Sequence, residues 1–190
     1  MTEDRLNKSD SALLLNNGYI RIPSGVYFNG DFTFMAWVKF NRRFTSLFVF
    51  KHSSRSLNIF CDIQAVNEIV RYMNRITHKS YNKTQCTVST LNTNLIITDT
   101  ELKLNQWIHL ALVFSNNSLR FYLNNTLNGK TSLEMLRNEY FNSNFIGKQG
   151  INNLEDYSIT YDEIKMFDRS LNEYELRKQT NFHESKQPFN

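Results

Sequence analysis

The sequence predicts an all-β protein, built as a two-sheet antiparallel sandwich with a short helix at its C-terminal end. Three observations support this prediction. Most of the chain consists of short segments with alternating apolar residues, turn-forming Asn and Gly residues separate several of them, and a helical period occurs only after residue 167. About a dozen strands with almost no helix are typical of two packed sheets.

The stretch GDFTFMAWVKF illustrates the strand pattern. Its even positions are apolar and predict a core-facing row, formed by Phe32, Phe34, Ala36, Val38 and Phe40. Met35 and Trp37 make the opposite row partly apolar as well. We therefore expect this strand to be covered on both faces.

Residues 106–132 predict three strands joined by tight hairpins. The turns are expected at 115–118 and at Asn124 and Asn125, because Asn tolerates the positive φ that two-residue hairpin loops need. Further strands are predicted near 19–23, 46–51, 57–63, 68–76, 84–89, 94–98, 143–147 and 157–167. The core is expected to contain Phe32, Phe34, Val38, Leu110, Leu112, Ile164 and Met166.

The helix is predicted in DRSLNEYELRKQ. Either Ser170 with Glu173 or Asn172 with Glu175 would form a capping box at its start. With 190 residues, the chain is long enough for one domain with a sizeable core, which we place at 10–180, followed by a loose tail or linker at 181–190.

Composition restricts the class of protein. A hydrophobic share of 41%, an aromatic share of 14% and a mean hydropathy of -0.48 suit a globular domain, and no apolar run is long enough to span a membrane. The first thirty residues show no basic segment followed by an apolar one, so no secretory signal is visible. Two alternatives remain, an intracellular chain or a module cut from a longer precursor.

Cys61 and Cys86 lack the spacing of a metal site, and they lie in two strand-like segments that would neighbour one another. We expect a disulfide between them, and the alternative is two buried thiols. Glycosylation sequons occur at Asn7, Asn82, Asn116 and Asn124, although chance alone gives about three such matches in this composition. We predict glycans at Asn82, Asn116 and Asn124, and these sequons support an extracellular origin only weakly.

Asp162 stands out in the stretch SITYDEIKMF. Ile164 and Met166 make the even positions apolar, and Asp162 belongs to the same row. This parity predicts a carboxylate that faces the core. Such a group needs a partner for its charge.

The order of the segments resembles a known family. The motifs that carry the resemblance are Phe-Thr-x-x-x-Trp at 32–37, Trp-x-x-x-Ala at 107–111, and an Asp-Glu-hydrophobic strand that leads into Leu-x-x-x-Glu at 171–175. Together they resemble the laminin-G-like domain of the concanavalin A-like lectin/glucanase superfamily, over nearly the whole chain. The resemblance implies a jelly-roll sandwich that binds glycans or proteins as one domain of a larger secreted or cell-surface protein.

The resemblance also implies one structural calcium ion. Relatives hold it with an acidic residue in the first strand, an Asp in the last strand and main-chain carbonyls. Asp162 matches the last-strand residue, but the first-strand position falls on Asn16, which supplies an amide in place of a carboxylate. The alternative is that Asp162 accepts hydrogen bonds from backbone amides and from the side chain of Asn16 or Asn17.

Catalysis is not predicted, although the same superfamily includes glycosidases. These enzymes need two carboxylates that flank a sugar bond, and the strand motif Glu-x-Asp-x-x-Glu that would present them is absent. Glu155 and Asp156 are expected to lie on a loop. The histidines, His52, His78, His109 and His183, have no Ser or Cys partner at a recognisable nucleophile turn.

Charge gives the clearest indication of a ligand. The segment 39–83 contains nine basic residues against two acidic ones, Asp62 and Glu68. Arg71, Arg75, Lys79 and Lys83 share one parity, so an uninterrupted strand or hairpin would present them as one positive row. We predict a binding module with an anionic glycan or protein partner, without nucleic-acid binding or membrane insertion. The alternatives are a solvated face on a structural spacer domain and, third, a glycosidase-related enzyme.

Overall fold

The computed structural model describes residues 1–42, 44–51, 56–72, 75–90, 94–100, 103–132, 139–147 and 158–180. Within 44–46, 56–72, 75–90 and 94–100, only the backbone is described. The predicted tail at 181–190 lies outside these ranges. In the described part of the chain, no helix is long and apolar enough to cross a membrane.

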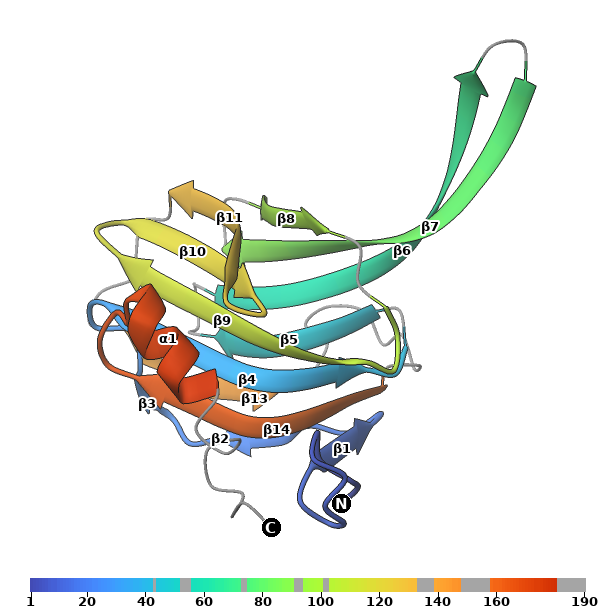
Figure 1. Cartoon of the computed structure of the whole chain (residues 1–190). Helices are drawn as coiled ribbons and strands as arrows, with labels where there is room; N and C mark the ends of the chain where they lie inside the picture. The colour runs from blue at the N-terminus through green and yellow to red at the C-terminus, as the bar shows by residue number, and fades with distance from the viewer. Residues whose placement is uncertain are drawn as a thin grey trace.

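Two six-stranded antiparallel sheets pack face to face, as the sequence predicts (Figure 1). The first sheet has the order β1 (Leu13–Asn16), β14 (Ser158–Phe167), β4 (Phe32–Phe40), β9 (Trp107–Ser115), β10 (Ser118–Leu123) and β11 (Thr126–Ser132). The second has the order β2 (Ile20–Ile22), β13 (Ser143–Ile146), β5 (Phe44–Lys51), β6 (Ser56–Tyr72), β7 (Arg75–Thr90) and β8 (Asn94–Thr100). A short pair, β3 (Gly25–Val26) with β12 (Tyr140–Phe141), lies beside them.

The main core fills the space between the two sheets. Of the predicted core residues, those on β4 and β9 are at most 4% exposed and are confirmed, namely Phe32, Phe34, Val38, Leu110 and Leu112. Ile164 is partly buried and packs against this core. Met166 is 41% exposed, so its assignment to the core is wrong. In the described strand pairing, Met166 has a neighbour on β4 alone, because β1 pairs with β14 between Ser158 and Tyr161.

The outer face of the first sheet carries a second, smaller apolar cluster. It contains Met35, Ala111, Val113, Tyr122, Leu171 and Leu176. Leu176 belongs to the helix α1 (Glu173–Thr180), which covers this face in Figure 1. Residues 32–40 of β4 are buried or partly buried throughout, which confirms the prediction that this strand is covered on both sides.

The capping box of α1 uses the second predicted pair. The Asn172 amide N–H donates to Glu175 Oε2 at 2.9 Å, and the Glu175 amide N–H donates to Asn172 Oδ1 at 2.9 Å. Ser170 instead donates to Asp31 at 3.1 Å. The helix therefore begins after Asn172, and the backbone hydrogen bond from Asn172 lowers the pKa of Glu175.

The hairpin turns form as the asparagine pattern predicts. Asn116 and Asn117 connect β9 to β10 with φ of 50° and 55°, and Asn124 and Asn125 connect β10 to β11 with φ of 46° and 63°. Positive φ at both central residues is the property of the type I′ turn, whose twist matches that of the flanking strands.

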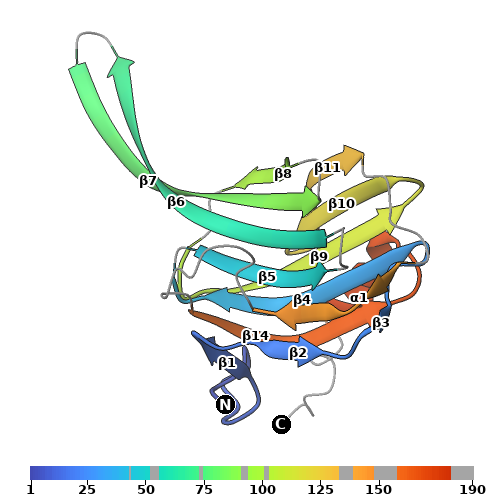
Figure 2. The ribbon, with the colours of Figure 1, turned by 180° about the vertical axis from the view of Figure 1, so that it is seen from behind.

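The strand boundaries differ from the prediction in the segment 57–89. Segments 57–63 and 68–76, predicted as two strands, belong to the single strand β6 up to Tyr72, and Arg75 already begins β7. β6 and β7 pair without a register shift, from Leu57 opposite Thr90 to Tyr72 opposite Arg75. This long hairpin leaves the body of the sandwich as an arm, which Figure 2 shows from the other side.

Candidate functional site

Asp162 lies on the outer face of the first sheet, so the prediction that it faces the sandwich core is wrong. On β14 it is Ile159 and Tyr161 that enter the core, at 0% and 1% exposure. A β-bulge between Asp162 and Lys165 adds one residue against β4, and Glu163 has a φ of 49°. One extra residue exchanges the two faces, so the parity of Ile164 and Met166 does not extend back to Asp162.

Arg5 is the partner that balances Asp162. Its Nη1 lies 3.3 Å from Asp162 Oδ2 and 2.9 Å from Glu163 Oε1, and the Arg5 and Asp162 side chains are only 5% and 10% exposed. The guanidinium stacks over the indole of Trp37 at 4.8 Å. Burial and, next, the neighbouring Glu163 raise the pKa of Asp162, while Arg5 acts in the opposite direction.

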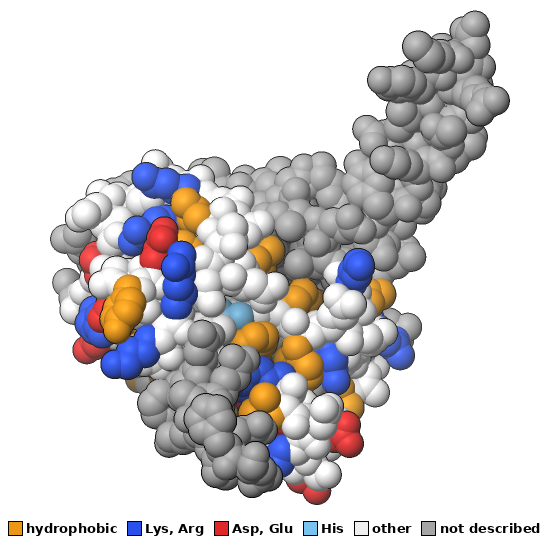
Figure 3. All heavy atoms as spheres, viewed as in Figure 1, with side chains coloured by type: hydrophobic (Ala, Val, Ile, Leu, Met, Phe, Trp, Pro, Cys, Tyr) orange, Lys and Arg blue, Asp and Glu red, His pale blue; other side chains and the backbone are white. Residues whose placement is uncertain are grey.

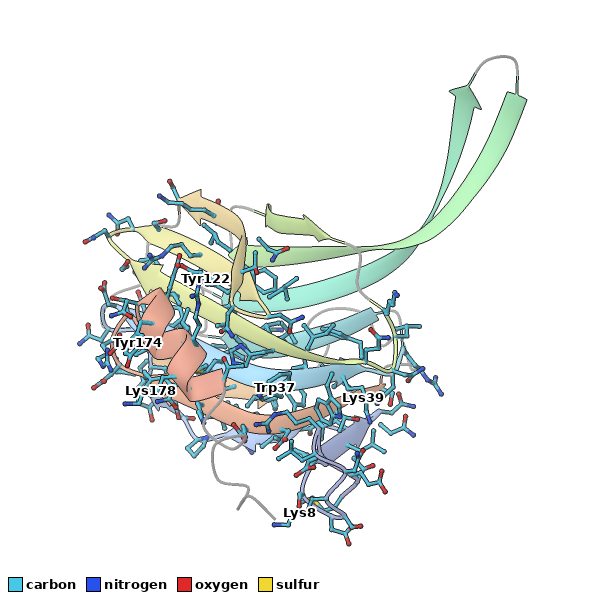
Figure 4. All side chains as sticks on the ribbon, in the orientation of Figure 1. Lys8, Trp37, Lys39, Tyr122, Tyr174 and Lys178 are labelled. Carbon is cyan, nitrogen blue, oxygen red and sulfur yellow. The ribbon has the colours of Figure 1, made fainter. Side chains whose placement is uncertain are left out.

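Figure 4 shows the position of Trp37 on this sheet, between α1 and the N-terminal segment. Residues 1–12 precede β1 and supply Arg5, which no sequence motif marks as a functional residue. Lys165 Nζ approaches Glu163 Oε2 at 3.3 Å on the same strand. The site therefore contains two cations and two carboxylates, and one of the cations, Arg5, lies over the indole ring of Trp37.

The structure does not bring Asn16 to Asp162. Asn16 pairs with Ser158, four residues along β14, which corresponds to about 13 Å at about 3.3 Å per residue. The two predicted calcium ligands are thus separated along β14, and Asp162 pairs with Arg5. In the ranges that the structure describes, no group of three His, Cys, Asp or Glu side chains is placed to hold a metal. Calcium binding stays an untested prediction.

His109 is buried beside Trp37, at 2% exposure, with ring centroids 5.3 Å apart. Thr180 Oγ1 of α1 lies 3.4 Å from His109 Nδ1. The backbone N–H of His109 donates to Asn124 Oδ1 at 3.0 Å. Burial, with the nearby cations Lys165 and Arg5, lowers the pKa of His109 from 6.5 to about 4. The imidazole is therefore uncharged at neutral pH.

The arm is the second candidate site. β5 pairs with β6 only up to Asp62, and β8 pairs with β7 only from Thr84, so the described strand pairing of 63–72 and 75–83 is with each other alone. Ten residues on β6 and nine on β7 correspond to about 30 Å at about 3.3 Å per residue. The arm projects from the body in Figure 1 and Figure 2.

The hairpin register corrects the predicted row of four basic residues. Directly paired residues occupy the same face, and Arg71 pairs with Ile76 while Arg75 pairs with Tyr72. This register places position 71 on one face and positions 75, 79 and 83 on the other. Lys79 is opposite Glu68, which offsets part of this charge. A shorter row remains, at Arg75, Lys79 and Lys83.

Charge is concentrated in the arm. Residues 63–84 contain four basic residues and one acidic residue, a net charge of +3, against +4 for the whole chain. The rest of the chain is therefore close to neutral. On the body, Lys and Arg side chains also gather over α1 and the β10–β11 hairpin, at the left of Figure 3. The basic residues of these elements include Arg120 on β10, Lys130 on β11, and Arg177 and Lys178 on α1. They are distant from one another in the chain, so the sequence pattern did not single them out.

Cys61 and Cys86 are directly opposite each other in the β6–β7 register, at the base of the arm. Opposite residues in an antiparallel pair have Cα atoms about 4.5 to 5.5 Å apart, within the disulfide range of about 4.4 to 6.8 Å. The disulfide itself stays a prediction. We expect the denatured, unreduced protein to resist alkylation, and the reduced protein to take up two alkyl groups and lose about 2 kcal/mol of stability. Two alkyl groups without reduction would establish free thiols.

The predicted glycosylation sites have different surroundings. Asn116 is exposed at the β9–β10 turn, while the side chain of Asn124 accepts the His109 amide. Asn82 lies in the arm, opposite Ala65. Glu155 and Asp156, and the side chains of His52, His78 and His183, lie outside the described parts of the chain.

Comparison with known proteins identifies the family. A family model described as "Concanavalin A-like lectin/glucanases superfamily" matches residues 14–177. A comparison with curated protein sequences found no match.

Several solved structures share the fold. The binding domain of Paraclostridial Mosquitocidal Protein 1 superposes with a TM-score of 0.57 at 17% identity, covering 90% of this chain and 43% of that chain. Domain 4 of AbnA, a GH43 extracellular arabinanase from Geobacillus stearothermophilus in complex with arabinotriose, gives 0.57 at 17%, covering 87% and 74%. A Trypanosoma rangeli sialidase gives 0.61 at 15%, covering 90% and 28%. The chain thus spans less than half the length of the first of these, and at such identities the likeness concerns the fold alone.

Proposed function

The chain belongs to the concanavalin A-like lectin/glucanase superfamily, and from this premise we propose that it is a non-catalytic recognition module for an anionic glycan or protein partner. The observation that carries the proposal is the β6–β7 arm, with basic residues at positions 75, 79 and 83 on one face. Among structures of the same fold, one is a binding domain and another is in complex with arabinotriose. We propose an extracellular or cell-surface setting for this module.

The geometry of the arm favours an extended partner. Four-residue spacing separates neighbouring basic positions by about 13 Å at about 3.3 Å per residue, a repeat that an elongated polyanion can follow and a compact ligand cannot. Arginine adds planar, bidentate donors for sulfate and carboxylate groups. An isolated two-stranded ribbon is only marginally stable in water, so contact with a partner would also order the arm.

The two neighbouring carboxylates Asp162 and Glu163 support a role without catalysis. A glycosidase needs one carboxyl group free to protonate the leaving group and a second one free to act on the sugar. On the outer face of the first sheet, Asp162 and Glu163 both pair with Arg5. Neither is available for such a role while Arg5 is bound.

Heparin affinity chromatography tests the proposal. Replacing Arg75, Lys79 and Lys83 with alanine should lower the salt concentration at which the protein elutes, because attraction between exposed charges is screened by salt. Three charge contacts at about 0.5 kcal/mol each sum to about 1.5 kcal/mol, or about tenfold in affinity.

A control variant of equal net charge makes the result specific. Lys130, Arg177 and Lys178 are exposed on the body, and their alanine variant should elute close to the parent. Equal shifts in both triple variants would indicate attraction by net charge alone. No shift in the arm variant would leave the arm as a solvated face, which favours the structural spacer.

A further inference from the structure

The N-terminal segment forms a loop that is closed on itself. The Thr2 amide donates to the Ala12 carbonyl at 2.9 Å, and the Ala12 amide donates to the Thr2 carbonyl at 3.0 Å. Inside this loop, Asp4 Oδ1 accepts the amides of Leu6 at 2.8 Å and Lys8 at 2.9 Å. These contacts lie within residues 2–12, so the loop keeps its own hydrogen bonds whether or not it contacts the sheet.

Arg5 attaches this loop to the body. Of the described polar contacts between residues 2–12 and the rest of the chain, those of Arg5 with Asp162 and Glu163 reach the first sheet. The same side chain covers the Trp37 ring. We call the area formed by Trp37, Asp162 and Glu163 the Trp37 surface.

Arg5 forms hydrogen bonds to the Trp37 surface with only one of its three guanidinium nitrogens. Its Nη1 alone serves both carboxylates, at 3.3 Å and 2.9 Å. Its Nε and Nη2 are buried and have no hydrogen-bond partner among the described residues, and the same holds for Trp37 Nε1. Buried donors without partners oppose the docked state, so Arg5 is a weak occupant of the Trp37 surface.

We propose that the Trp37 surface is a docking site for an arginine side chain of a partner polypeptide, and that the loop 2–12 is its intramolecular competitor. Two adjacent carboxylates match the planar fork of a guanidinium, and an indole face attracts it through cation–π interaction. A peptide also carries a main-chain carbonyl beside its arginine, which the unpartnered Trp37 Nε1 can bind. This inference is independent of the arm, because it concerns the outer face of the other sheet.

The charges around the site agree with this ligand. Lys165, at 3.3 Å from Glu163, is the described cation that competes with an incoming arginine. His109, next to Trp37, is neutral at neutral pH and does not repel it. Lysine fits less well than arginine, because an ammonium group lacks the planar fork and is more strongly hydrated.

Tryptophan fluorescence tests the proposal. In a Trp107→Phe background, Trp37 is the remaining tryptophan, since the chain contains two. The Arg5→Ala variant should bind the blocked peptide acetyl-Gly-Arg-Gly-amide saturably, and acetyl-Gly-Lys-Gly-amide at least about tenfold more weakly. Adding Asp162→Asn should abolish the preference. The protein that retains Arg5 should bind the arginine peptide about ten- to a hundredfold more weakly, because the loop competes.

Several outcomes would overturn the proposal. Absence of saturable binding to folded Arg5→Ala protein, or equal affinity for the two peptides, would exclude an arginine site. Binding to Arg5→Ala protein with none to the Arg5 protein would mean that the loop is a permanent cover and no competitor. If Arg5→Ala does not fold, Arg5→Lys retains the charge beside both carboxylates and should bind the arginine peptide more tightly than the Arg5 protein does. Failure of that variant to do so would equally reject the site.

Discussion

Acidification from pH 7 to pH 4 is expected to lower the free energy of unfolding by about 3 kcal/mol through His109 alone, and His109→Gln should remove most of this loss. Burial between β9, Trp37 and α1 lowers the pKa of His109 from 6.5 to about 4. In the unfolded chain the same imidazole titrates near its ordinary value. A shift of this size corresponds to about 3 kcal/mol at about 1.36 kcal/mol per pKa unit.

The sign follows from the direction of the shift. Because the folded protein keeps His109 neutral, the unfolded chain binds the proton more tightly, and the contribution is fully present above pH 6.5. It is lost progressively as the pH falls toward 4. The raised pKa of Asp162 acts in the opposite sense, since protonation of a buried carboxylate favours the folded state in acid, and it offsets part of the loss.

Urea unfolding at several pH values, for the parent and for His109→Gln, measures this effect. The variant should be less stable than the parent at pH 7, and the difference between them should shrink as the pH falls. His183→Gln, from the C-terminal ten residues, is the matched control and should follow the parent. Parallel profiles for the parent and His109→Gln would show that His109 carries no such linkage.

Local patterns were sufficient for much of the fold. Alternation identified β4 and β9, and asparagine pairs located both type I′ turns, because each signal depends only on neighbouring residues. The capping box was limited to two candidates, and Asn172 with Glu175 is the pair that forms. Backbone preferences of this kind do not depend on distant contacts.

The site was harder to predict because its determinants are not local. The bulge after Asp162 depends on pairing with β4, and parity counted along the chain has no way to include an extra residue. The partner of Asp162 is 157 residues away, in a segment without strand or helix pattern. The parity that predicted a core-facing Asp162 was the available signal, and it indicated the need for a charge partner without identifying Arg5.

The arm shows a related difficulty. The predicted row of basic residues required one uninterrupted strand or a hairpin that preserved parity. In the β6–β7 register, the residue numbers of each directly paired couple add up to an odd number, as in Tyr72 opposite Arg75. Residues of equal parity on the two strands therefore occupy opposite faces. A register in which the paired residue numbers added up to an even number would have kept all four basic positions on one face. Composition does not distinguish between these two registers.

Tyr161→Ala is expected to cause the largest loss of stability, about 4 kcal/mol. The Tyr161 side chain is 1% exposed and lies in the core between the sheets. Its hydroxyl donates to the Leu47 carbonyl at 2.9 Å, which connects β14 of the first sheet to β5 of the second. Leu47 lies at a bulge in the described β5–β6 pairing and has no partner residue on β6, and its carbonyl accepts this bond together with the Gly147 amide.

Comparison with Tyr161→Phe separates packing from hydrogen bonding. Phenylalanine keeps the ring, and the Leu47 carbonyl still accepts the Gly147 amide at 3.2 Å, so the loss should be only about 1 kcal/mol. Urea unfolding of both variants gives the two values, and Tyr174→Ala, at a site 73% exposed on α1, should change stability little. If Tyr161→Phe were as destabilising as Tyr161→Ala, the bond between the sheets would outweigh the cavity. A loss below about 1 kcal/mol for Tyr161→Ala would contradict the placement of this ring in the core.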